Sequence, residues 1–564
     1  MKQLGGFSNV FSEGLGDQMK NILLINPPVS IYKNKTAFVP LALLVMGTCL
    51  KQLRQQGAPI AWSVLDLDLL IKKGQLPDEE SFFALAGQLI LEREPDMLMF
   101  TVHGPNHILV LKLAEQIKRK RSCLIVVGGV GPSLKSREAL ERSPQIDIIV
   151  KGEAEPVLPG LVTALTGNGD LGGVPSLVYR QNGVVCENPR QHLPLEHPIP
   201  APDYSLIRLA EYIEHNRTHP YVDPGFVLIE SGRGCSYGCS FCAPSKMWQR
   251  RVRYRPIPEI IEEMHWLADQ GGTFSFFTQD NLDRRFLQEL STQLLSRQRR
   301  IAWGCYSRLD KLPPESAQLL AQAGCKIIFT GLETTSPSAQ KQIRKQIDAD
   351  ATYEKLLEFN RHGIRFIGSF IAGFDGETPE ELEHTMRFAI ECAAGQSLDE
   401  LARVVQATAL ENLPQSPANI CVIHPYLHMV GTDSFEEVID QLYISRYSVH
   451  PDCYGSYLFR YENFKEDWSF LGTNPYLSHL PEERAGYYCS TLRLFNFLNS
   501  RPHYFALLMQ NQALGPLALL HRMADSLGPE LVLEATLERF EQGCRDYVKD
   551  HLGFVPTWTV KKGQ

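Results

Sequence analysis

Short apolar stretches alternate with amphipathic ones along residues 21–166, and this pattern constrains the fold of the chain more than any other feature. The apolar stretches are NILLINPP (21–28), WSVLDLD (62–68), DMLMFTVHGPN (96–106), CLIVVGGVGP (123–132) and IDIIVKGEAE (146–155). The stretches between them, such as LALLVMGTCLKQLRQQG, have the spacing of helices that bury one face. Buried strands that alternate with helices predict an α/β fold with a doubly wound parallel sheet.

The carboxyl ends of these strands are the expected ligand site, because open parallel sheets bind ligands at that edge. The residues at those ends that we select as candidate contacts are Asn26, Pro27, Thr101, His103, Gly128, Gly129, Gly131, Ser133, Gly152 and Glu153. Glycines after the fourth strand would let a ligand approach the backbone closely. They do not form the G-x-G-x-x-G pattern, so by themselves they do not specify the ligand.

Beyond residue 166 the pattern changes twice. A hairpin with its turn at Asn182-Gly183 is followed by five prolines between residues 189 and 202, which indicate a stiff linker. Strand–helix alternation then returns in six units, which predicts a partial (βα)6 barrel, and a mainly helical pattern completes the chain. The predicted segments are a flexible N-terminus (1–20), the sheet domain (21–166), the hairpin and linker (167–225), the barrel (226–432) and a helical domain (433–564).

Composition excludes several classes of function. Apolar residues make up 44% and charged residues 21% of the 564 residues, with a net charge of −8 and no block of like charges. This balance argues against a nucleic-acid or membrane partner and favours a small-molecule or peptide substrate. No apolar stretch approaches the roughly 20 residues that cross a bilayer, and no signal segment begins the chain. We therefore expect a cytoplasmic protein.

Three of the 13 cysteines form the only close group, Cys235-x3-Cys239-x2-Cys242, in a glycine-containing loop after an expected strand. Thiolates are the ligands of iron–sulfur clusters, and this spacing lets three sulfurs converge on one face of a [4Fe–4S] cube. The fourth iron would stay open to a small molecule. A structural zinc site would need a fourth ligand, commonly from a second motif, and none lies nearby in the sequence. Ordinary thiols are the remaining alternative.

The motif and its position after the first strand of a partial barrel resemble the radical SAM superfamily, over roughly residues 226–432. The resemblance implies that the open iron binds S-adenosylmethionine (SAM) and that its reductive cleavage gives a 5′-deoxyadenosyl radical. Gly331-Leu332-Glu333 is similar to the family element whose carboxylate contacts the SAM ribose. Arg308 matches a common polar position for the SAM carboxylate, and Phe241 is a candidate for contact with the adenine. The family's GGE element is replaced by Thr278-Gln279-Asp280-Asn281, so we expect Gln279 and Asp280 near the amine.

Residues 21–166 resemble the cobalamin-binding, Rossmann-like domain that is fused to many radical SAM enzymes. The resemblance rests on the NPP turn, the PLALLVMG helix start, VVGGVGPS, IVKGEAEP and the junction HPIPAPDYSLI. It implies that the candidate contacts above bind cobalamin. The D-x-H-x-x-G motif of free-standing cobalamin modules is absent, as it usually is in the fused proteins. His103 and His107 lie near the expected site, and an ordinary loop role is the simpler interpretation of each.

Together these resemblances predict a cobalamin-dependent radical SAM methyltransferase that acts on an unactivated carbon, or on phosphorus, through methylcobalamin and the deoxyadenosyl radical. Its cofactors would be the [4Fe–4S] cluster, SAM and cobalamin, and an electron donor such as flavodoxin or ferredoxin would be a partner. A radical SAM enzyme of the same build could instead catalyse a rearrangement, a cyclisation or an oxidation. A cobalamin or cluster sensor without turnover is the alternative outside enzymes. The sequence does not identify the substrate or a catalytic base.

Overall fold

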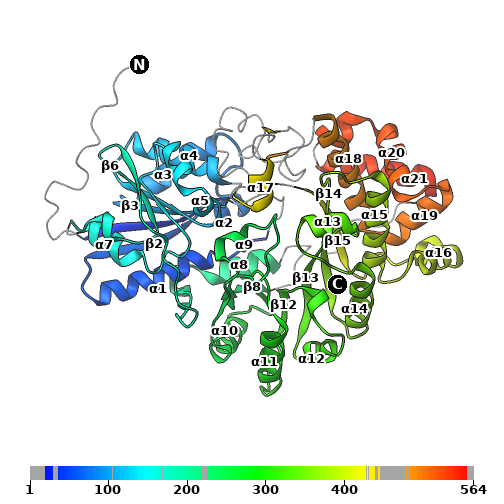
Figure 1. Ribbon diagram of the computed structural model, residues 1–564, viewed down its shortest axis with the longest axis horizontal. Coiled ribbons are helices and arrows are strands. Elements are labelled where there is room, and N and C mark those ends of the chain that lie inside the picture. Colours follow the sequence, from blue (N-terminus) through cyan, green and yellow to red (C-terminus); the bar gives the residue numbers. More distant parts are fainter. Residues whose placement is uncertain are drawn as a thin grey trace.

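The computed structural model describes residues 19–28, 36–103, 106–167, 169–217, 225–426, 428–429, 431–438, 443–444, 477–478, 482–535 and 537–554. The N-terminus that we expected to be flexible lies outside them, apart from its last two residues. Figure 1 shows an N-terminal sheet domain in blue and cyan, a barrel in green, and helices in orange and red on the far side of the barrel. The α/β fold class with a helical C-terminal region is confirmed.

The N-terminal domain is built on a seven-stranded sheet with the order β2-β1-β3-β4-β5-β6-β7. Its strands are β1 (Lys20–Asn26), β2 (Ile60–Asp66), β3 (Met97–Thr101), β4 (Leu124–Gly128), β5 (Ile148–Val150), β6 (Leu177–Gln181) and β7 (Val184–Glu187). The first five are parallel, as predicted. Along β1, Leu23 and Ile25 face one buried cluster and Ile22 and Leu24 face another, so both faces of the sheet are covered. This is why the strands are continuous apolar runs rather than alternating ones.

Helices on the two faces of this sheet supply those clusters. They are α1 (Leu41–Gln55), α2 (Leu67–Lys72), α3 (Ser81–Leu91), α4 (His107–Lys118), α5 (Val130–Leu134), α6 (Ser136–Glu141) and α7 (Leu158–Leu165). The predicted hairpin is confirmed: Asn182 and Gly183 have φ values of 51° and 80°, as a two-residue turn of the primed type requires. The hairpin pairs antiparallel with β5 and so extends the sheet of the N-terminal domain.

The barrel has six parallel strands in the order β15-β14-β13-β12-β11-β8, and its two edge strands are not paired with each other. The strands are β8 (Phe226–Ile229), β11 (Phe274–Phe277), β12 (Ala302–Tyr306), β13 (Cys325–Glu333), β14 (Arg365–Ala372) and β15 (Ile420–Pro425). The helices around them include α10 (Ile257–Asp269), α11 (Arg284–Leu295), α12 (Ser316–Gln322), α14 (Ala349–Arg361), α15 (Pro379–Ala394) and α16 (Leu398–Ala407). The predicted partial (βα)6 barrel is therefore confirmed.

Side chains of the C-terminal helices protect the open edge of this barrel. Asn496 of α18 (Glu482–Asn499) accepts a hydrogen bond from the Ile423 N–H at 2.9 Å and donates to the Ile423 carbonyl at 2.9 Å. Asn499 donates to the carbonyl of Cys421 at 3.0 Å. An unpaired edge strand would otherwise expose its backbone groups to pairing with another chain. Three further helices, α19 (Pro502–Gln512), α20 (Pro516–Leu527) and α21 (Leu537–Leu552), share the buried core of the barrel.

None of the described helices is both long enough and apolar enough to span a membrane.

We predict that Asn496→Ala lowers the free energy of unfolding by about 1–3 kcal/mol, because it leaves a buried backbone N–H and C=O without their side-chain partners. Urea unfolding followed by circular dichroism measures the change. The control is Gln542→Ala, which removes an exposed amide that bonds only to Asp546 on its own helix and should change stability by less than about 0.5 kcal/mol. Equal urea midpoints of unfolding for the two variants would show that Asn496 of α18 does not protect the edge strand β15.

Candidate functional site

The carboxyl ends of the two parallel sheets are brought together by a direct contact between their loops. The short helix α5, which follows β4, packs against α9 (Ala243–Trp248), which follows the cysteine loop. The linker supports this contact, because Arg190 donates to the Met247 carbonyl at the end of α9 at 2.5 Å. The predicted cobalamin edge of one sheet therefore lies beside the predicted cluster loop of the other.

A buried ion-pair network joins the same two loops. Arg233, two residues before Cys235, contacts Glu153 and Glu155 of the N-terminal domain, each at 2.7 Å, and Glu230 at 2.8 Å. Arg253 also pairs with Glu153. Burial alone would lower the pKa of the Arg233 guanidinium, but the charges of Glu230 and Glu155 raise it. The cysteine loop is thus tied by charge to the loop after β5.

The cysteine loop itself is held at both ends. Before it, β9 (Gly232–Arg233) pairs antiparallel with β10 (Arg253–Tyr254). Gly234 has φ +95°, and a Cβ there would lie 2.0 Å from the Arg251 carbonyl oxygen, so only glycine fits this turn. Inside the loop, the Ser240 N–H donates to the Ile343 carbonyl at 3.1 Å and the Ser240 carbonyl accepts from the Ser434 N–H at 3.1 Å. Backbone hydrogen bonds to distant segments therefore fix the shape of the loop.

The three thiols of the motif are the predicted ligands of a [4Fe–4S] cube. Cys235, Cys239 and Cys242 are free and half-buried. Among the described residues, no three His, Cys, Asp or Glu side chains are gathered closely enough to hold one ion. A cube binds each thiolate through a different iron and so takes ligands that stand further apart. Burial raises the pKa of Cys242 to about 12, and the two neighbouring cysteines add to this effect, so a bound cation would be needed to stabilise the thiolates.

The predicted SAM residues converge on this loop. The pKa of Cys239 is raised by burial, while the charges of Lys345 and Arg308 lower it and that of Glu333 raises it again. Burial also raises the pKa of Cys235; the charge of Asp280 raises it further, and that of Arg308 lowers it. Residues from the ends of β8, β11, β12 and β13 therefore form one site.

Glu333 ends β13 in a strained conformation, with φ +65°. Its buried carboxylate is paired with the buried ammonium of Lys345. A Cβ at Gly331 would lie 2.1 Å from the carboxylate oxygen and 2.5 Å from the Lys345 Nζ, so a side chain at Gly331 would collide with this pair. The ladder between β13 and β14 shifts register at the same point. The G-x-E element thus presents a charged pair at the top of the barrel.

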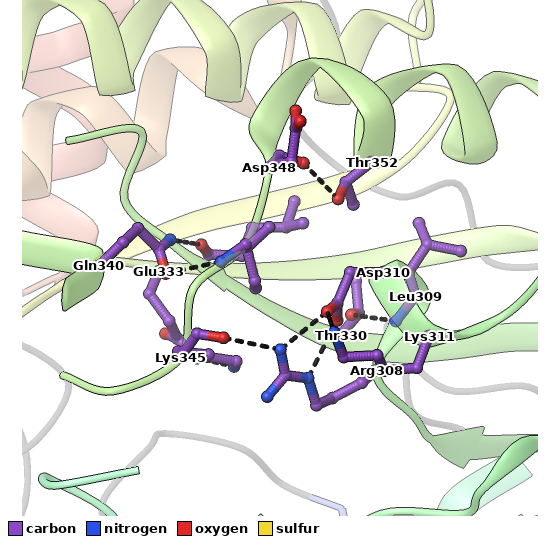
Figure 2. Close-up of polar contacts among 12 residues, drawn as sticks. Arg308, Leu309, Asp310, Lys311, Thr330, Glu333, Gln340, Lys345, Asp348 and Thr352 are labelled. Atoms are coloured by element: carbon purple, nitrogen blue, oxygen red, sulfur yellow. Dashed lines mark hydrogen bonds and ion pairs between the residues drawn. The ribbon is translucent and has the colours of Figure 1, made fainter. Parts of the chain in front are cut away.

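Arg308 forms the neighbouring part of the site. Its guanidinium binds both oxygens of Asp310, at 3.0 and 2.8 Å, and donates to the Lys345 carbonyl at 2.9 Å (Figure 2). It also lies 4.3 Å from the ring centre of Tyr237 in the cysteine loop. Burial alone would lower the pKa of Arg308, but its contacts with Asp310 raise it. The arginine therefore joins the end of β12 to the cysteine loop and to the segment that carries Lys345.

The other three SAM candidates differ in their surroundings. Gln279 is fully buried beneath the loop, where its amide donates to the Gly234 and Asn281 carbonyls at 3.4 Å. Asp280 is exposed beyond the end of β11, and desolvation by the surrounding protein raises its pKa to about 6 despite hydrogen bonds from Gly234 and Trp248. Phe241 packs on a small apolar cluster that includes Phe374 and Tyr426. Contact of these residues with SAM stays a prediction.

The cobalamin candidates line one edge of the N-terminal sheet. Thr101 and Gly128 are register partners on β3 and β4. Ser133 donates to the Gly129 carbonyl at 2.6 Å and accepts from the Gly152 N–H at 2.9 Å, so it ties the loops after β4 and β5 together. Pro27 is buried and Gly131 half-buried at the same edge.

Backbone constraints also explain part of the glycine pattern. Gly129 has φ +114°, and a Cβ there would lie 2.3 Å from the Val102 carbonyl oxygen. A glycine at this position is therefore required by the fold itself, with or without a ligand. At Gly128 a Cβ would make only ordinary contacts, the nearest at 3.8 Å, so this position is free for a ligand to approach.

Two polar candidates are engaged in contacts that the sequence did not reveal. The Asn26 amide donates to Asp66 at 3.0 Å, and Asp66 also accepts from the Tyr212 hydroxyl at 2.6 Å. Glu153 belongs to the network around Arg233. By contrast, His103 is exposed just beyond the end of β3. Its backbone N–H donates to the Asn106 side-chain oxygen at 2.8 Å. Desolvation by the surrounding protein lowers the pKa of its imidazole. Whether these residues contact cobalamin stays a prediction.

Sequence reasoning missed Lys345, Tyr237 and Arg233. Lys345 lies between two residues with positive φ, Arg344 and Gln346, and no local pattern marks it. Tyr237 was visible inside the cysteine motif and Arg233 just before it, but only tertiary structure gives them partners.

Comparisons with known proteins agree with this geometry. The family model of the radical SAM superfamily matches residues 229–389, and the model of the B12 binding domain matches residues 61–162. The chain is a radical SAM enzyme with a B12-binding domain. These two domains imply a [4Fe–4S] cluster, SAM and cobalamin as its cofactors.

Two curated relatives and one solved structure illustrate the similarity. An uncharacterized methyltransferase of Pyrococcus horikoshii is 28% identical over 318 residues, which are 55% of this chain and 67% of the relative. An anaerobic magnesium-protoporphyrin IX monomethyl ester cyclase of Synechocystis is 26% identical over 63% of this chain and 69% of the relative. The cobalamin-dependent SAM radical enzyme OxsB, with aqua-cobalamin and SAM bound, superposes with a TM-score of 0.61 at 15% identity, over 97% of this chain and 78% of OxsB.

We predict that replacing Cys235, Cys239 and Cys242 together by alanine abolishes the visible absorption of the protein after anaerobic reconstitution, whereas the wild type takes up about four irons and four sulfides per chain. Iron and sulfide analysis measures the loss. The control is Cys186→Ala, which removes a half-buried free thiol on β7 and should leave the iron content unchanged. Full iron retention in the triple variant would refute the cluster assignment.

We further predict that Asp66→Asn changes how stability depends on pH. Burial and the charge of Asp68 raise the pKa of Asp66 to about 6, above its unfolded value of about 3.9. The folded state therefore keeps this proton to a higher pH than the unfolded state does. The stability that the protonated group gives is lost as the pH rises from about 4 through about 6.

Relative to the wild type, Asp66→Asn should gain on the order of 2 kcal/mol between pH 4.5 and 7, since each unit of pKa difference corresponds to about 1.4 kcal/mol. Urea unfolding at several pH values measures this gain. The exposed carboxylate of Asp525 supplies the control, because Asp525→Asn should run parallel to the wild type. If the stability of Asp66→Asn also ran parallel to that of the wild type across this pH range, the raised pKa of Asp66 would be contradicted.

Proposed function

We propose that this enzyme methylates an unactivated carbon, or phosphorus, of a small-molecule or peptide substrate with the help of cobalamin. The observation that carries this proposal is the packing of α5 on α9, because it sets the expected cobalamin edge of the N-terminal sheet beside the cysteine loop. A reaction that uses both cofactors in one cycle needs them next to each other. The name of the Pyrococcus horikoshii relative, a methyltransferase, supports methyl transfer.

The residues of the chain would hold the groups in place. Cys235, Cys239 and Cys242 would ligate the cluster, and the charged pair of Glu333 and Lys345 offers one acceptor and one donor to a polar ligand above the barrel. Arg308 stays cationic through Asp310 and offers a second positive group. When bound, cobalamin supplies a cobalt that can carry a methyl group, and the cluster with SAM supplies a radical that removes a hydrogen atom. The fixed shape of the cysteine loop would keep the reacting groups in register.

A second candidate is a cyclisation that does not transfer a methyl group. The observation that favours it is the relative from Synechocystis, which is named a cyclase and matches more of this chain than the methyltransferase does. The two candidates share cofactors and differ in how SAM is used.

The consumption of SAM separates them. If cobalt carries the methyl group, one SAM remethylates cobalt and gives S-adenosylhomocysteine, while a second gives 5′-deoxyadenosine and methionine. We therefore predict about one equivalent of each nucleoside for each methylated product, in reactions with cobalamin-loaded enzyme and a reductant. Liquid chromatography with mass spectrometry measures all three compounds.

The control is the triple cysteine variant, which should produce no 5′-deoxyadenosine. Deoxyadenosine without S-adenosylhomocysteine would favour the cyclisation. S-adenosylhomocysteine and methylated product without deoxyadenosine would mean polar methyl transfer, with the cluster in another role.

A further inference from the structure

A cavity of about 370 Å³ opens beside the cysteine loop, on the side of Tyr237. Tyr237 and Arg308, which lie in contact, line it together with residues from the start of α11 and from the turn after β12. The site described above uses the loop through its cysteines. This cavity lies at the residues between Cys235 and Cys239, and Arg308 is the one lining residue that also has a role in the proposed reaction.

Positive charge dominates this cavity. Its lining includes the side chains of Arg284, Arg285, Arg308 and Lys311 and a single acidic residue, Asp283. Arg284 and Arg285 are exposed at the start of α11, and neither forms an ion pair within the part of the chain that the structure describes. Lys311 pairs with Asp310, yet its side chain is 51% exposed.

The acidic groups nearby are already engaged. Asp283 accepts from the Phe286 N–H at 3.0 Å as the N-cap of α11 and from the Tyr254 hydroxyl at 2.6 Å. Asp310 is held between Arg308 and Lys311. On the next turn of the loop, a Cβ at Gly238 would lie 2.3 Å from the guanidinium of Arg250, so this exposed arginine also rests on the loop. The chain as a whole carries a net charge of −8, which makes this basic surface a local exception.

We propose that the surface formed by Arg250, Arg284, Arg285 and Lys311 docks an acidic one-electron donor protein, which passes its electron to the cluster through the Tyr237 side of the loop. This inference rests on the proposed function, because only a redox-active cluster needs an electron. The donor loses one electron and the cluster gains it, so no other reactant is involved. Electron transfer weakens steeply with distance, and the cysteine loop reaches the surface here with Tyr237 half-buried.

The charges fit a protein partner of this kind. Electron-transfer encounters are small and weak, and they depend on complementary charge for steering rather than on apolar area. The free arginines stand on the rim of the cavity, where a folded partner can reach them. A small anion held inside the cavity would need buried cationic groups aimed at it, and the cationic residues that line the cavity besides Arg308 are exposed: Arg284, Arg285 and Lys311.

Binding of an oxidised, acidic flavodoxin to the cluster-loaded enzyme tests the proposal by isothermal titration calorimetry. Arg284→Glu/Arg285→Glu should raise the Kd by about fivefold or more at low salt. The matched control is Lys120→Glu/Lys326→Glu, which reverses two exposed lysines away from the loop and should leave the Kd unchanged. The wild-type Kd should rise when ionic strength increases from about 0.03 to 0.3 M, because salt screens exposed charges.

Equal Kd values for the two double variants would overturn the proposal, and so would a wild-type Kd that does not respond to salt. Tight binding of inorganic phosphate in the cavity, with the flavodoxin Kd unchanged by the reversal, would assign the cavity to a small anion instead. If Arg284→Glu/Arg285→Glu loses iron, Arg284→Gln/Arg285→Gln replaces it, with a smaller increase in Kd expected.

Reduction of the cluster gives an independent measurement. In stopped-flow experiments, flavodoxin hydroquinone should reduce the charge-reversed enzyme more slowly than the wild type, whereas dithionite should reduce both at the same rate. Equal rates with flavodoxin would again overturn the docking surface. Failure of the proposed function has a different signature: the wild-type enzyme would release neither nucleoside with dithionite and substrate, while flavodoxin binding would still depend on Arg284 and Arg285.

Discussion

Arg233 holds the two halves of this enzyme in register. Its guanidinium is shared among Glu230 of its own domain and Glu153 and Glu155 of the N-terminal domain, and its backbone leads directly into Gly234 and Cys235. Any movement of the loop after β5 is therefore passed to Cys235, the first cysteine of the motif. The contact of α5 with α9 and the bond from Arg190 to α9 act in the same direction.

Such a network is a costly way to gain stability. Buried ion pairs often contribute little net free energy, because removing the charges from water offsets their attraction, whereas loss of one partner is strongly destabilising. Here five charged side chains are largely buried at one boundary. An apolar interface could slide, but ion pairs with defined geometry hold the two loops in one arrangement. For the proposed reaction, in which two cofactors would work together, a single arrangement matters more than a few kcal/mol.

At the top of the barrel, too, a defined geometry is kept at a cost in stability. Glu333 has a left-handed backbone conformation that costs on the order of 1–3 kcal/mol. The shift in register between β13 and β14, the glycine at 331 and the ammonium of Lys345 together keep it there. Arg308 then joins Lys345 to Tyr237 of the cysteine loop. Three strand ends, those of β8, β12 and β13, are thereby connected through side chains.

The sequence alone determined both sheets, the hairpin and the position of the cysteine loop. These features are local: strands and helices differ in the period of their apolar residues, Asn182-Gly183 specifies its own turn, and the three cysteines lie within eight residues. The tertiary structure decided the partners. Glu153 and Arg233 are 80 residues apart, Asn26 and Asp66 are 40 apart, and Ile423 and Asn496 are 73 apart. No short-range pattern encodes which of many polar side chains will meet, because that choice depends on how separately folded segments pack. For this reason Lys345 escaped the sequence analysis, although it lies only 12 residues from the glutamate it neutralises.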